Sequence, residues 1–337
     1  MSIVGGLDIH RAQSTFEFVD TATGEIGRGR VGGTREELRA WLAGFDGGDV
    51  KFAVEGCTGW RYVVEELARA GIEAHLAEPA DTAWLKSRKK RAKTDRADAA
   101  HLRQLLMEGQ IPESWIPPHH VAEVRMLARM YHQLMTSRRR WLQRIHAQLF
   151  HQGAPPISGL TTDEGHRLLT EADLSVAGRR YVEEAIEIVD DFTGRIETLR
   201  GDLKRIGRSQ PGCVALQSLW GIGPLLATII WAEMGDTRRF SSSKQAVRFT
   251  GLDITVNDSD GHGPPGKLSR QGSPTLRWAL VEAAQHASKK QSPDYLYYQQ
   301  TRRRVGASRA ALSVARKHTR RIHHILRRLG DDAWNEI

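Results

Sequence analysis

The segment SIVGGLDI, residues 2–9, is a short apolar run that carries an acid, Asp8, at its end. Such a run is typical of a buried strand. The next segment, STFEFV at 14–19, alternates apolar and polar side chains, the turn TATGE follows, and EIGRGRV at 25–31 continues as a third extended segment. The three segments predict an antiparallel meander at the start of an α/β domain.

Helices and strands alternate after the meander. Thr34 and Glu37 form a capping box in front of a segment with apolar residues at helical spacing. The segments that follow are the strand KFAVEG at 51–56, the helix WRYVVEELARA at 60–70, the strand IEAHLAE at 72–78 and a helix that carries KTDRADAAHLRQLLMEG at 93–109. The predicted order is βββαβαβα around a mixed sheet.

Four carboxylates fall on elements that this order brings together. Asp8 lies at the end of the first strand, and Glu55 lies at the C-terminal end of the fourth. Asp95 and Asp98 project from one helix face, about 60° apart around its axis. If that helix docks over the strand ends, the four acids converge and repel one another unless a divalent cation neutralises them. Hard carboxylate ligands suit Mg²⁺ or Mn²⁺, which support phosphoryl transfer.

Each acid also has a plain structural interpretation when it is taken alone. Asp8 suits a turn or cap, Glu55 suits a loop before Gly56, and Asp95 suits the N-cap of its helix. The ordered set Asp, Glu, Asp-x-x-Asp favours a metal site over these separate roles. We expect a basic run before the last pair to draw a nucleic-acid backbone toward the acids. This run consists of Lys86, Arg88, Lys89, Lys90, Arg91 and Lys93.

Composition limits the class of protein. The 337 residues are 40% hydrophobic, which is enough for two or three domains with cores, and Lys plus Arg number 49 against 40 Asp plus Glu. The clustered excess of +9 favours a polyanionic partner such as DNA or RNA over a generic basic surface. Cys57 and Cys213 have neither disulfide-framework nor zinc-site spacing. Without a signal-like N-terminus or a run of about 18 apolar residues, we expect a cytosolic protein with no membrane partner.

The middle of the chain predicts two long helices. Residues 122–151 place apolar side chains three and four positions apart, with Arg138, Arg139, Arg140 and Arg144 among them. A coiled coil and a basic RNA-facing helix are both consistent with this pattern. GAPPISG at 153–159 breaks it, and a second helical region spans about 171–206. Two antiparallel helices fit, and packing within one chain and dimerisation both stay open because clean heptads are absent.

Six motifs resemble one known family. GLDIH at 6–10, AVEGCTGW at 53–60 and KTDRADA at 93–99 are similar to the three acidic motifs of the RuvC-like DEDD domain in transposases of insertion-sequence family 110. LWGIGPLLATIIWAEMGDTRRF, FTGLDITVNDSDG and GKLSRQGSPTLRWALVEAA, between 219 and 284, resemble the C-terminal transposase domain of that family. The resemblance implies an RNase H/RuvC-like domain over 1–115, a helical or coiled-coil segment over 116–207 and a mainly α domain over 208–337.

A glycine-rich loop over 253–272 combines serines with the cations Lys267 and Arg270. A serine in such a loop is often only a turn residue, but it also suits a nucleophile presented to DNA. The family resemblance implies that Ser259 is the catalytic serine, and the neighbouring Ser269 and Ser273 stay open as alternatives.

Two further regions suit contact with phosphates. Gly221 and Gly223 enter an apolar helix, where backbone N–H groups can meet a phosphate or the turn can be a tight helix junction. The tail surrounds an apolar stripe with cations, and we interpret its outer face, together with His323 and His324, as a surface for phosphate contact. These cations are Arg302, Arg303, Arg304, Arg309, Arg316, Lys317, Arg320, Arg321, Arg327 and Arg328.

The resemblance implies a transposase or recombinase of a mobile insertion sequence in the bacterial cytosol. It would cut and rejoin double-stranded DNA through a transient phosphoserine link, using Mg²⁺ or Mn²⁺ at the DEDD acids, with a structured bridge RNA as guide. It would act as a homo-oligomer, a dimer or a tetramer assembled on DNA. Two alternatives stay open: a metal-dependent, structure-selective endonuclease that uses water, and a nucleic-acid-binding scaffold whose acids hold no metal.

Overall fold

The computed structural model describes residues 2–45, 48–85, 94–254 and 268–336. Contacts divide the chain into two units, Met1–Ile116 and Pro117–Ile337. The further boundary expected at residue 207 stays a prediction. Several residues expected at the functional site lie outside the described residues, namely Lys86, Arg88, Lys89, Lys90, Arg91, Lys93, Ser259 and Lys267.

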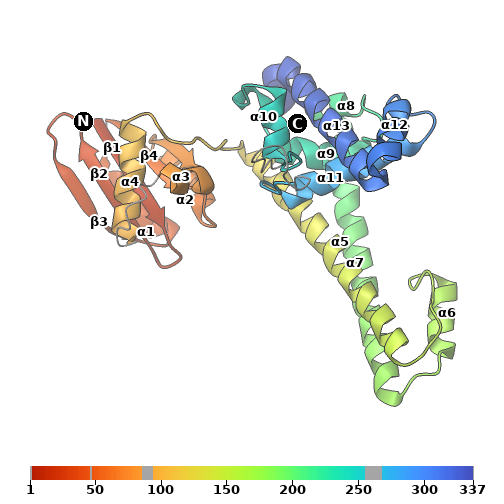
Figure 1. The fold of residues 1–337 in the computed structure, drawn as a ribbon. Coiled ribbons are helices and arrows are strands. Elements are labelled where there is room, and N and C mark those ends of the chain that lie inside the picture. The colour runs from red at the N-terminus through yellow and green to blue at the C-terminus, as the bar shows by residue number, and fades with distance from the viewer. Residues whose placement is uncertain (1, 46–47, 86–93, 255–267, 337) are drawn as a thin grey trace, which may run out of the picture. The chain divides into compact units, whose positions relative to one another are not determined.

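The first unit contains the expected mixed sheet (Figure 1). Its strands lie in the order β3-β2-β1-β4-β5. The meander β1, β2 and β3 is antiparallel, whereas β1, β4 and β5 pair in parallel. The five strands are β1 (Ser2–Ile9), β2 (Gln13–Asp20), β3 (Ile26–Gly32), β4 (Asp49–Glu55) and β5 (Glu73–Ala77).

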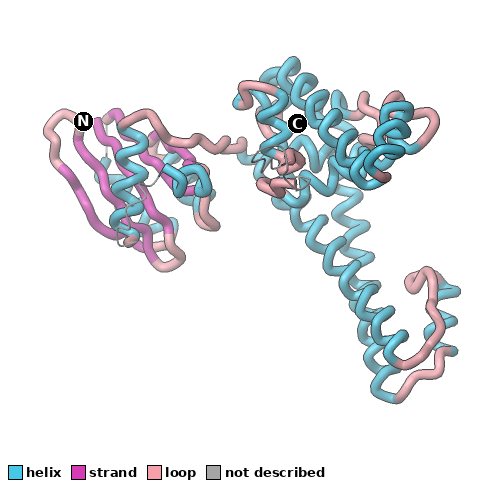
Figure 2. Tube along the Cα trace, viewed as in Figure 1, coloured by secondary structure: helices cyan, strands magenta, loops and turns pink. Residues whose placement is uncertain are grey.

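Helices cover both faces of this sheet (Figure 2). On one face, α1 (Arg35–Leu42) and α2 (Trp60–Arg69) pack on a core that includes Leu7 and Phe52. On the other, α4 (Asp95–Met107) packs Leu102 and Leu106 on Val4, Val19, Ala53 and Ala77. The unit also contains η1 (Ala43–Phe45) and α3 (Pro79–Leu85), and α3 is not among the helices predicted above.

The caps of two helices show how the chain fixes their starts. The capping box between Thr34 and Glu37 is present at α1, as predicted. At α4, the side chain of Thr94 accepts a hydrogen bond from the backbone N–H of Ala97. Thr94 is therefore the N-cap, and the interpretation of Asp95 as the cap is wrong. Asp95 and Asp98 are in the first turn, where the positive end of the helix dipole favours carboxylates.

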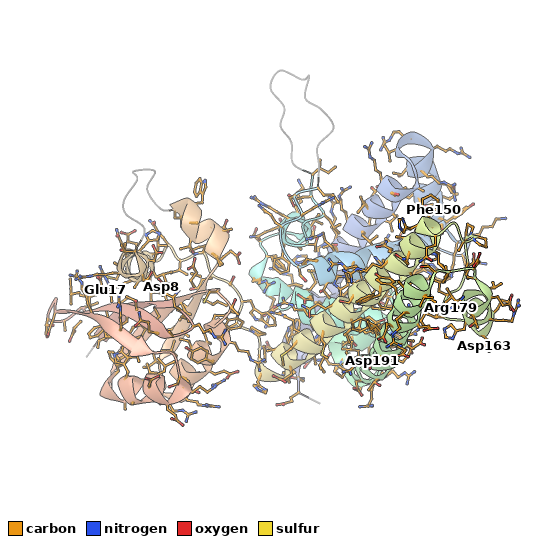
Figure 3. All side chains as sticks on the ribbon, turned by 90° about the horizontal axis from the view of Figure 1, so that it is seen from below. Asp8, Glu17, Phe150, Asp163, Arg179 and Asp191 are labelled. Atoms are coloured by element: carbon orange, nitrogen blue, oxygen red, sulfur yellow. The ribbon has the colours of Figure 1, made fainter. Side chains whose placement is uncertain are left out.

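The second unit begins with the two long helices that the sequence predicts. They are α5 (His119–His151) and α7 (Val176–Ser209), which lie side by side. The short helix α6 (Asp163–Glu171) packs beside the C-terminal end of α5, where Figure 3 labels Phe150 and Asp163. Arg138 Nε on α5 donates a 2.7 Å hydrogen bond to Thr193 Oγ1 on α7. The helices thus pack on each other within one chain, and a coiled coil between chains stays a prediction.

The rest of this unit is helical, as expected for the C-terminal region. Gly221, with φ +85°, precedes the buried helix α9 (Pro224–Met234), and a Cβ there would lie 2.4 Å from the Ala283 carbonyl oxygen, so the turn is a tight helix junction. No helix of the described residues is long and apolar enough to cross a membrane. The elements are α8 (Pro211–Leu216), α9 (Pro224–Met234), η2 (Thr237–Arg239), α10 (Ser243–Phe249), α11 (Pro274–Gln285), η3 (His286–Ser288), α12 (Tyr295–Val305), α13 (Ala307–Leu329) and η4 (Gly330–Trp334).

Candidate active site

Asp8 lies on the side of the sheet that α4 covers. Side chains alternate along a strand, so Asp8 shares its side with Val4 and Gly6, and Val4 is in the core under α4. A Cβ on Gly6 would lie only 2.2 Å from the Ala99 carbonyl oxygen of α4. The glycine therefore lets the helix backbone approach the strand closely beside the acid.

A histidine joins the acid on the strand to an acid on the helix. His10 Nε2 lies 3.2 Å from Asp8 Oδ2 and 3.4 Å from Asp95 Oδ1. Ligand atoms of these three residues all lie within 4.8 Å of one another. Asp8 is only 7% exposed, whereas the side chains of Asp95 and His10 are about half exposed. The cluster thus has a buried floor and an accessible rim.

Electrostatics also place Asp98 close to this cluster. Burial raises the pKa of Asp8 above its usual range, and the charges of Asp98 and Asp95 raise this pKa further, while His10 opposes the shift. The negative charges of Asp8, Asp95 and Asp98 therefore repel one another. A divalent cation would relieve this repulsion.

Glu55 belongs to the same end of the sheet by register. The parallel pairing of β1 and β4 aligns Leu7 with Val54, so Glu55 is the next residue beyond that pair and Asp8 is its counterpart. It is half-buried and shares its side of the strand with Ala53, which packs under α4. Among the described residues, the group whose ligand atoms lie within 4.8 Å of one another comprises Asp8, His10 and Asp95 but neither Glu55 nor Asp98.

Sequence reasoning missed two polar residues at this site. His10 had a usable signal, because residues two apart on a strand face the same side and His10 follows Asp8 by two. Thr15 had none, because its position depends on strand pairing. It is opposite Asp8 on β2, is 5% exposed, and its hydroxyl has no hydrogen-bond partner among the described residues.

The donor set fits a divalent cation. It offers two carboxylates and an imidazole nitrogen, and further carboxylates are close by. A hydrated cation beside Asp8 would also give the buried Thr15 hydroxyl a partner, which suits the rule that buried polar groups are satisfied. Carboxylate oxygens favour Mg²⁺ or Mn²⁺, whereas the imidazole also suits transition metals. The residues thus form a candidate site for a divalent metal and are compatible with more than one ion.

The arginines expected to contact nucleic acid divide into two groups. Arg138 and Arg321 are engaged within the chain, Arg138 with Thr193 and Arg321 with Asp294. The other described members of the set are exposed, on α5, beside α11, at the end of α12 and on α13. They are Arg139, Arg140, Arg270, Arg302, Arg303, Arg304 and Arg320.

His323 corrects one expectation about the tail. It is 2% exposed, so it is not a surface contact for phosphate, whereas His324 is exposed. The reason is the phase of α13, whose buried side includes Ile322, His323 and Leu326. Burial lowers the pKa of His323, as expected for an imidazole inside a helical core.

The two alternative serines have structural partners. The hydroxyl of Ser269 donates to the carboxylate of Asp253. Ser273 is the N-cap of α11, where its hydroxyl accepts from the backbone N–H of Leu276 at 3.3 Å. Isolated pairing of Ile254 with Leu268 brings together the ends of the described chain around residues 255–267.

Fold and site together define an α/β protein with an Asp–His–Asp cluster beside its sheet and a helical C-terminal unit. Comparison with known families agrees. Residues 5–151 match the DEDD domain model of insertion-sequence family 110, described as "Transposase", and residues 213–299 match the model described as "Transposase IS116/IS110/IS902 family". The chain belongs to the IS110 family of transposases.

Individual relatives have matching names. The chain is 28% identical over 243 residues to the putative transposase y4rJ of Sinorhizobium fredii, covering 65% of this chain and 60% of that protein. It is 28% identical over 131 residues to the transposase for insertion sequence element IS1111A of Coxiella burnetii, covering 38% of this chain and 36% of that protein. The matches thus span 60% or less of the length of these relatives.

Proposed function

We propose that this chain is a DNA transposase that cuts and rejoins double-stranded DNA at a metal site formed by Asp8, Glu55, Asp95 and Asp98. One observation carries the proposal: His10 links the buried carboxylate of Asp8, on the sheet, to Asp95 on α4. Membership of the transposase family supports DNA as the substrate class.

The side chains have distinct roles in this proposal. Asp8, as the buried acid, and Glu55 would hold Mg²⁺ or Mn²⁺ from the sheet, while Asp95 and Asp98 would do so from the helix. When bound, the cation neutralises charge on the phosphate and on both oxygens that exchange at phosphorus. His10, whose Nε2 lies close to both Asp8 and Asp95, would offer an imidazole nitrogen beside these acids.

We assign the nucleophile to Ser259, on the strength of the family resemblance. Its Oγ would form a bond to phosphorus as the P–O bond of the DNA backbone breaks, and the displaced oxygen takes a proton to become a strand-end hydroxyl. Attack by another strand's hydroxyl then reverses these changes and releases the serine. The structural partners of Ser269 and Ser273 support this choice, because those hydroxyls already stabilise local structure.

Partners follow from the same resemblance. We propose double-stranded DNA at the element ends and target, a structured bridge RNA as guide, and a homo-oligomer in the bacterial cytosol. The exposed arginines on α12 and α13 support nucleic-acid binding, since cations that neutralise phosphates release counterions. Arg302, Arg303 and Arg304 are consecutive at the end of α12, and all three are exposed.

Adduct trapping tests this function. The full chain is incubated with labelled element-end DNA, target DNA, RNA transcribed from the flanking sequence and Mg²⁺, then separated under denaturing conditions. We expect a covalent protein–DNA adduct that is absent from Ser259→Ala and Asp95→Asn but retained in Ser269→Ala. Cutting without an adduct in any variant would instead establish a hydrolytic nuclease that uses water. DNA binding without cutting would establish a scaffold.

A further inference from the structure

A second buried acid lies on the same side of the sheet as Asp8. Glu17 on β2 is opposite Gly6 of β1, and its side chain is only 3% exposed. Figure 3 shows Asp8 and Glu17 near each other on the sheet. Unlike Asp8, Glu17 is held by two guanidinium groups. Arg103 Nε, on α4, lies 2.9 Å from Oε1, and Arg28 Nε, on β3, lies 2.7 Å from Oε2.

The two arginines differ in what they connect. Arg28 belongs to a strand that is already paired with β2, so its bond adds nothing to the position of a helix. Arg103 belongs to the helix that carries Asp95 and Asp98, and its side chain is 18% exposed against 45% for Arg28. The Arg103 bond is therefore a directional link between the sheet and α4.

The apolar contacts of α4 do not fix its position along its axis equally well, and its polar contact with His10 involves Asp95 of the metal site itself. Leu102 and Leu106 pack on small and β-branched side chains, and hydrophobic contact is non-directional. The close approach at Gly6 sets how near the helix lies to the sheet. A shift by one helical turn would move the helix by about 5.4 Å, which is far more than the ~2.1 Å length of a bond from oxygen to Mg²⁺.

We propose that Glu17 and Arg103 are positioning residues for the metal site. Their ion pair fixes α4 on the sheet so that Asp95 and Asp98 face Asp8 at a separation that one cation can bridge. The inference rests on the proposed metal-binding function of these acids. It assigns the pair a role in metal affinity that is separate from its role in stability.

Those two roles can be separated experimentally. Replacing both members of a buried ion pair by apolar side chains of similar volume is often neutral or stabilising, because desolvation offsets the attraction. A Glu17→Met/Arg103→Met double variant should therefore keep its fold but lose the directional link. Arg28→Met is the matched control, since it removes the other guanidinium from the same carboxylate.

The test measures Mn²⁺ binding to the full chain by electron paramagnetic resonance of free Mn²⁺, with Asp8→Asn defining binding elsewhere, and melting by calorimetry. We expect the double variant to melt close to the wild type but to bind Mn²⁺ at least about tenfold more weakly, as is typical when groups that orient ligands are removed. Arg28→Met should bind Mn²⁺ within about twofold of the wild type, because α4 keeps its link to Glu17.

The outcomes are distinguishable. A folded double variant with wild-type Mn²⁺ affinity overturns the positioning role while leaving the metal site intact. A wild-type chain without Asp8-dependent Mn²⁺ binding overturns the metal site and this inference together. If the double variant does not fold, Arg103→Lys decides, because lysine keeps the charge but not the planar geometry of the guanidinium. Weaker Mn²⁺ binding by Arg103→Lys at unchanged melting supports positioning, and unchanged binding refutes it.

Discussion

Asp8 and Glu17 are buried carboxylates on the same side of one sheet, yet their surroundings are opposite. Glu17 accepts hydrogen bonds from two arginines, whereas Asp8 has an imidazole as its partner and two further carboxylates close by. Burying a carboxylate is costly unless a cation compensates it. Arginines neutralise the charge of Glu17, which holds the helix. The negative charge of Asp8 has no such cation within the described residues, and a metal ion would neutralise it.

Buried acids of the helical unit follow the pattern of Glu17. Asp294 is 1% exposed and contacts Lys317 at 2.8 Å as well as Arg321. Burial raises the pKa of Asp294, but the two cations outweigh burial and lower this pKa to about 2. Glu233 is 3% exposed and accepts two hydrogen bonds from Arg129, at 2.7 and 3.0 Å. Buried acids that are paired with cations therefore connect elements of the fold, whereas Asp8 is not paired with an arginine or a lysine in the part of the chain that the structure describes. This contrast can be tested by mutation.

The largest effect should come from removing a compensated acid. Asp294→Ala leaves Lys317 and Arg321 facing a buried space without their carboxylate. We expect a loss of ~3 kcal/mol in the free energy of unfolding, at the low end for a broken buried pair because both cations are partly exposed. Urea denaturation measures it, with the exposed Asp173→Ala as control within about 0.5 kcal/mol of the wild type. An equal effect in both variants would contradict the contrast.

Local patterns in the sequence predict much of the fold and the outline of the site. The spacing of Asp95 and Asp98 places both in the first turn of α4, and the position of Asp8 places it at a strand end, as the structure confirms. These are short-range consequences of helix and strand periodicity. They extend to the capping box at Thr34 and to the long helices α5 and α7.

The compensating contacts depend on tertiary pairing and so escape this reasoning. Arg103 is 86 residues from Glu17 in the chain, and Thr15 reaches Asp8 only through strand register. In the tail, Arg321 has the same local pattern as Arg320, but one binds Asp294 and the other is exposed. Sequence alone identifies the cations of this helix but does not show which of them are paired with acids within the chain.

A smaller loss should follow when α4 is moved away from the sheet. Gly6→Ala adds a Cβ that would lie 2.2 Å from the Ala99 carbonyl oxygen, a backbone atom that cannot rotate away. We expect ~1–3 kcal/mol of destabilisation, the usual range for overpacking, together with weaker Mn²⁺ binding. Gly44→Ala is the control, because its Cβ would have open space. Wild-type stability and Mn²⁺ affinity in Gly6→Ala would show that α4 need not approach so closely.

The next largest effect should be a pH dependence of stability that comes from Asp294. The lowered pKa of Asp294 means that its stabilising contribution is present above the unfolded value of 3.8 and is lost as the pH falls through about 2. Allowing for solvent screening of the partly exposed cations, this amounts to about 1–2 kcal/mol. Between about pH 5 and 2, the free energy of unfolding should fall more steeply with decreasing pH in the wild type than in Asp294→Asn. Parallel curves would refute the assignment.

The smallest effect should have the opposite sign and come from Asp8. Its pKa is raised by burial and by Asp98 and Asp95, so its contribution to stability is full below the unfolded value of 3.8 and is lost as the pH rises through the folded value. Asp8→Asn should therefore raise the melting temperature of the metal-free chain near neutral pH, and the gain should vanish in acid. Glu17→Gln, its neighbour on the sheet, should instead lower the melting temperature, because it weakens two ion pairs. A shift of the same sign in both variants, measured by calorimetry with a chelator present, would mean that the two acids are not electrostatic opposites.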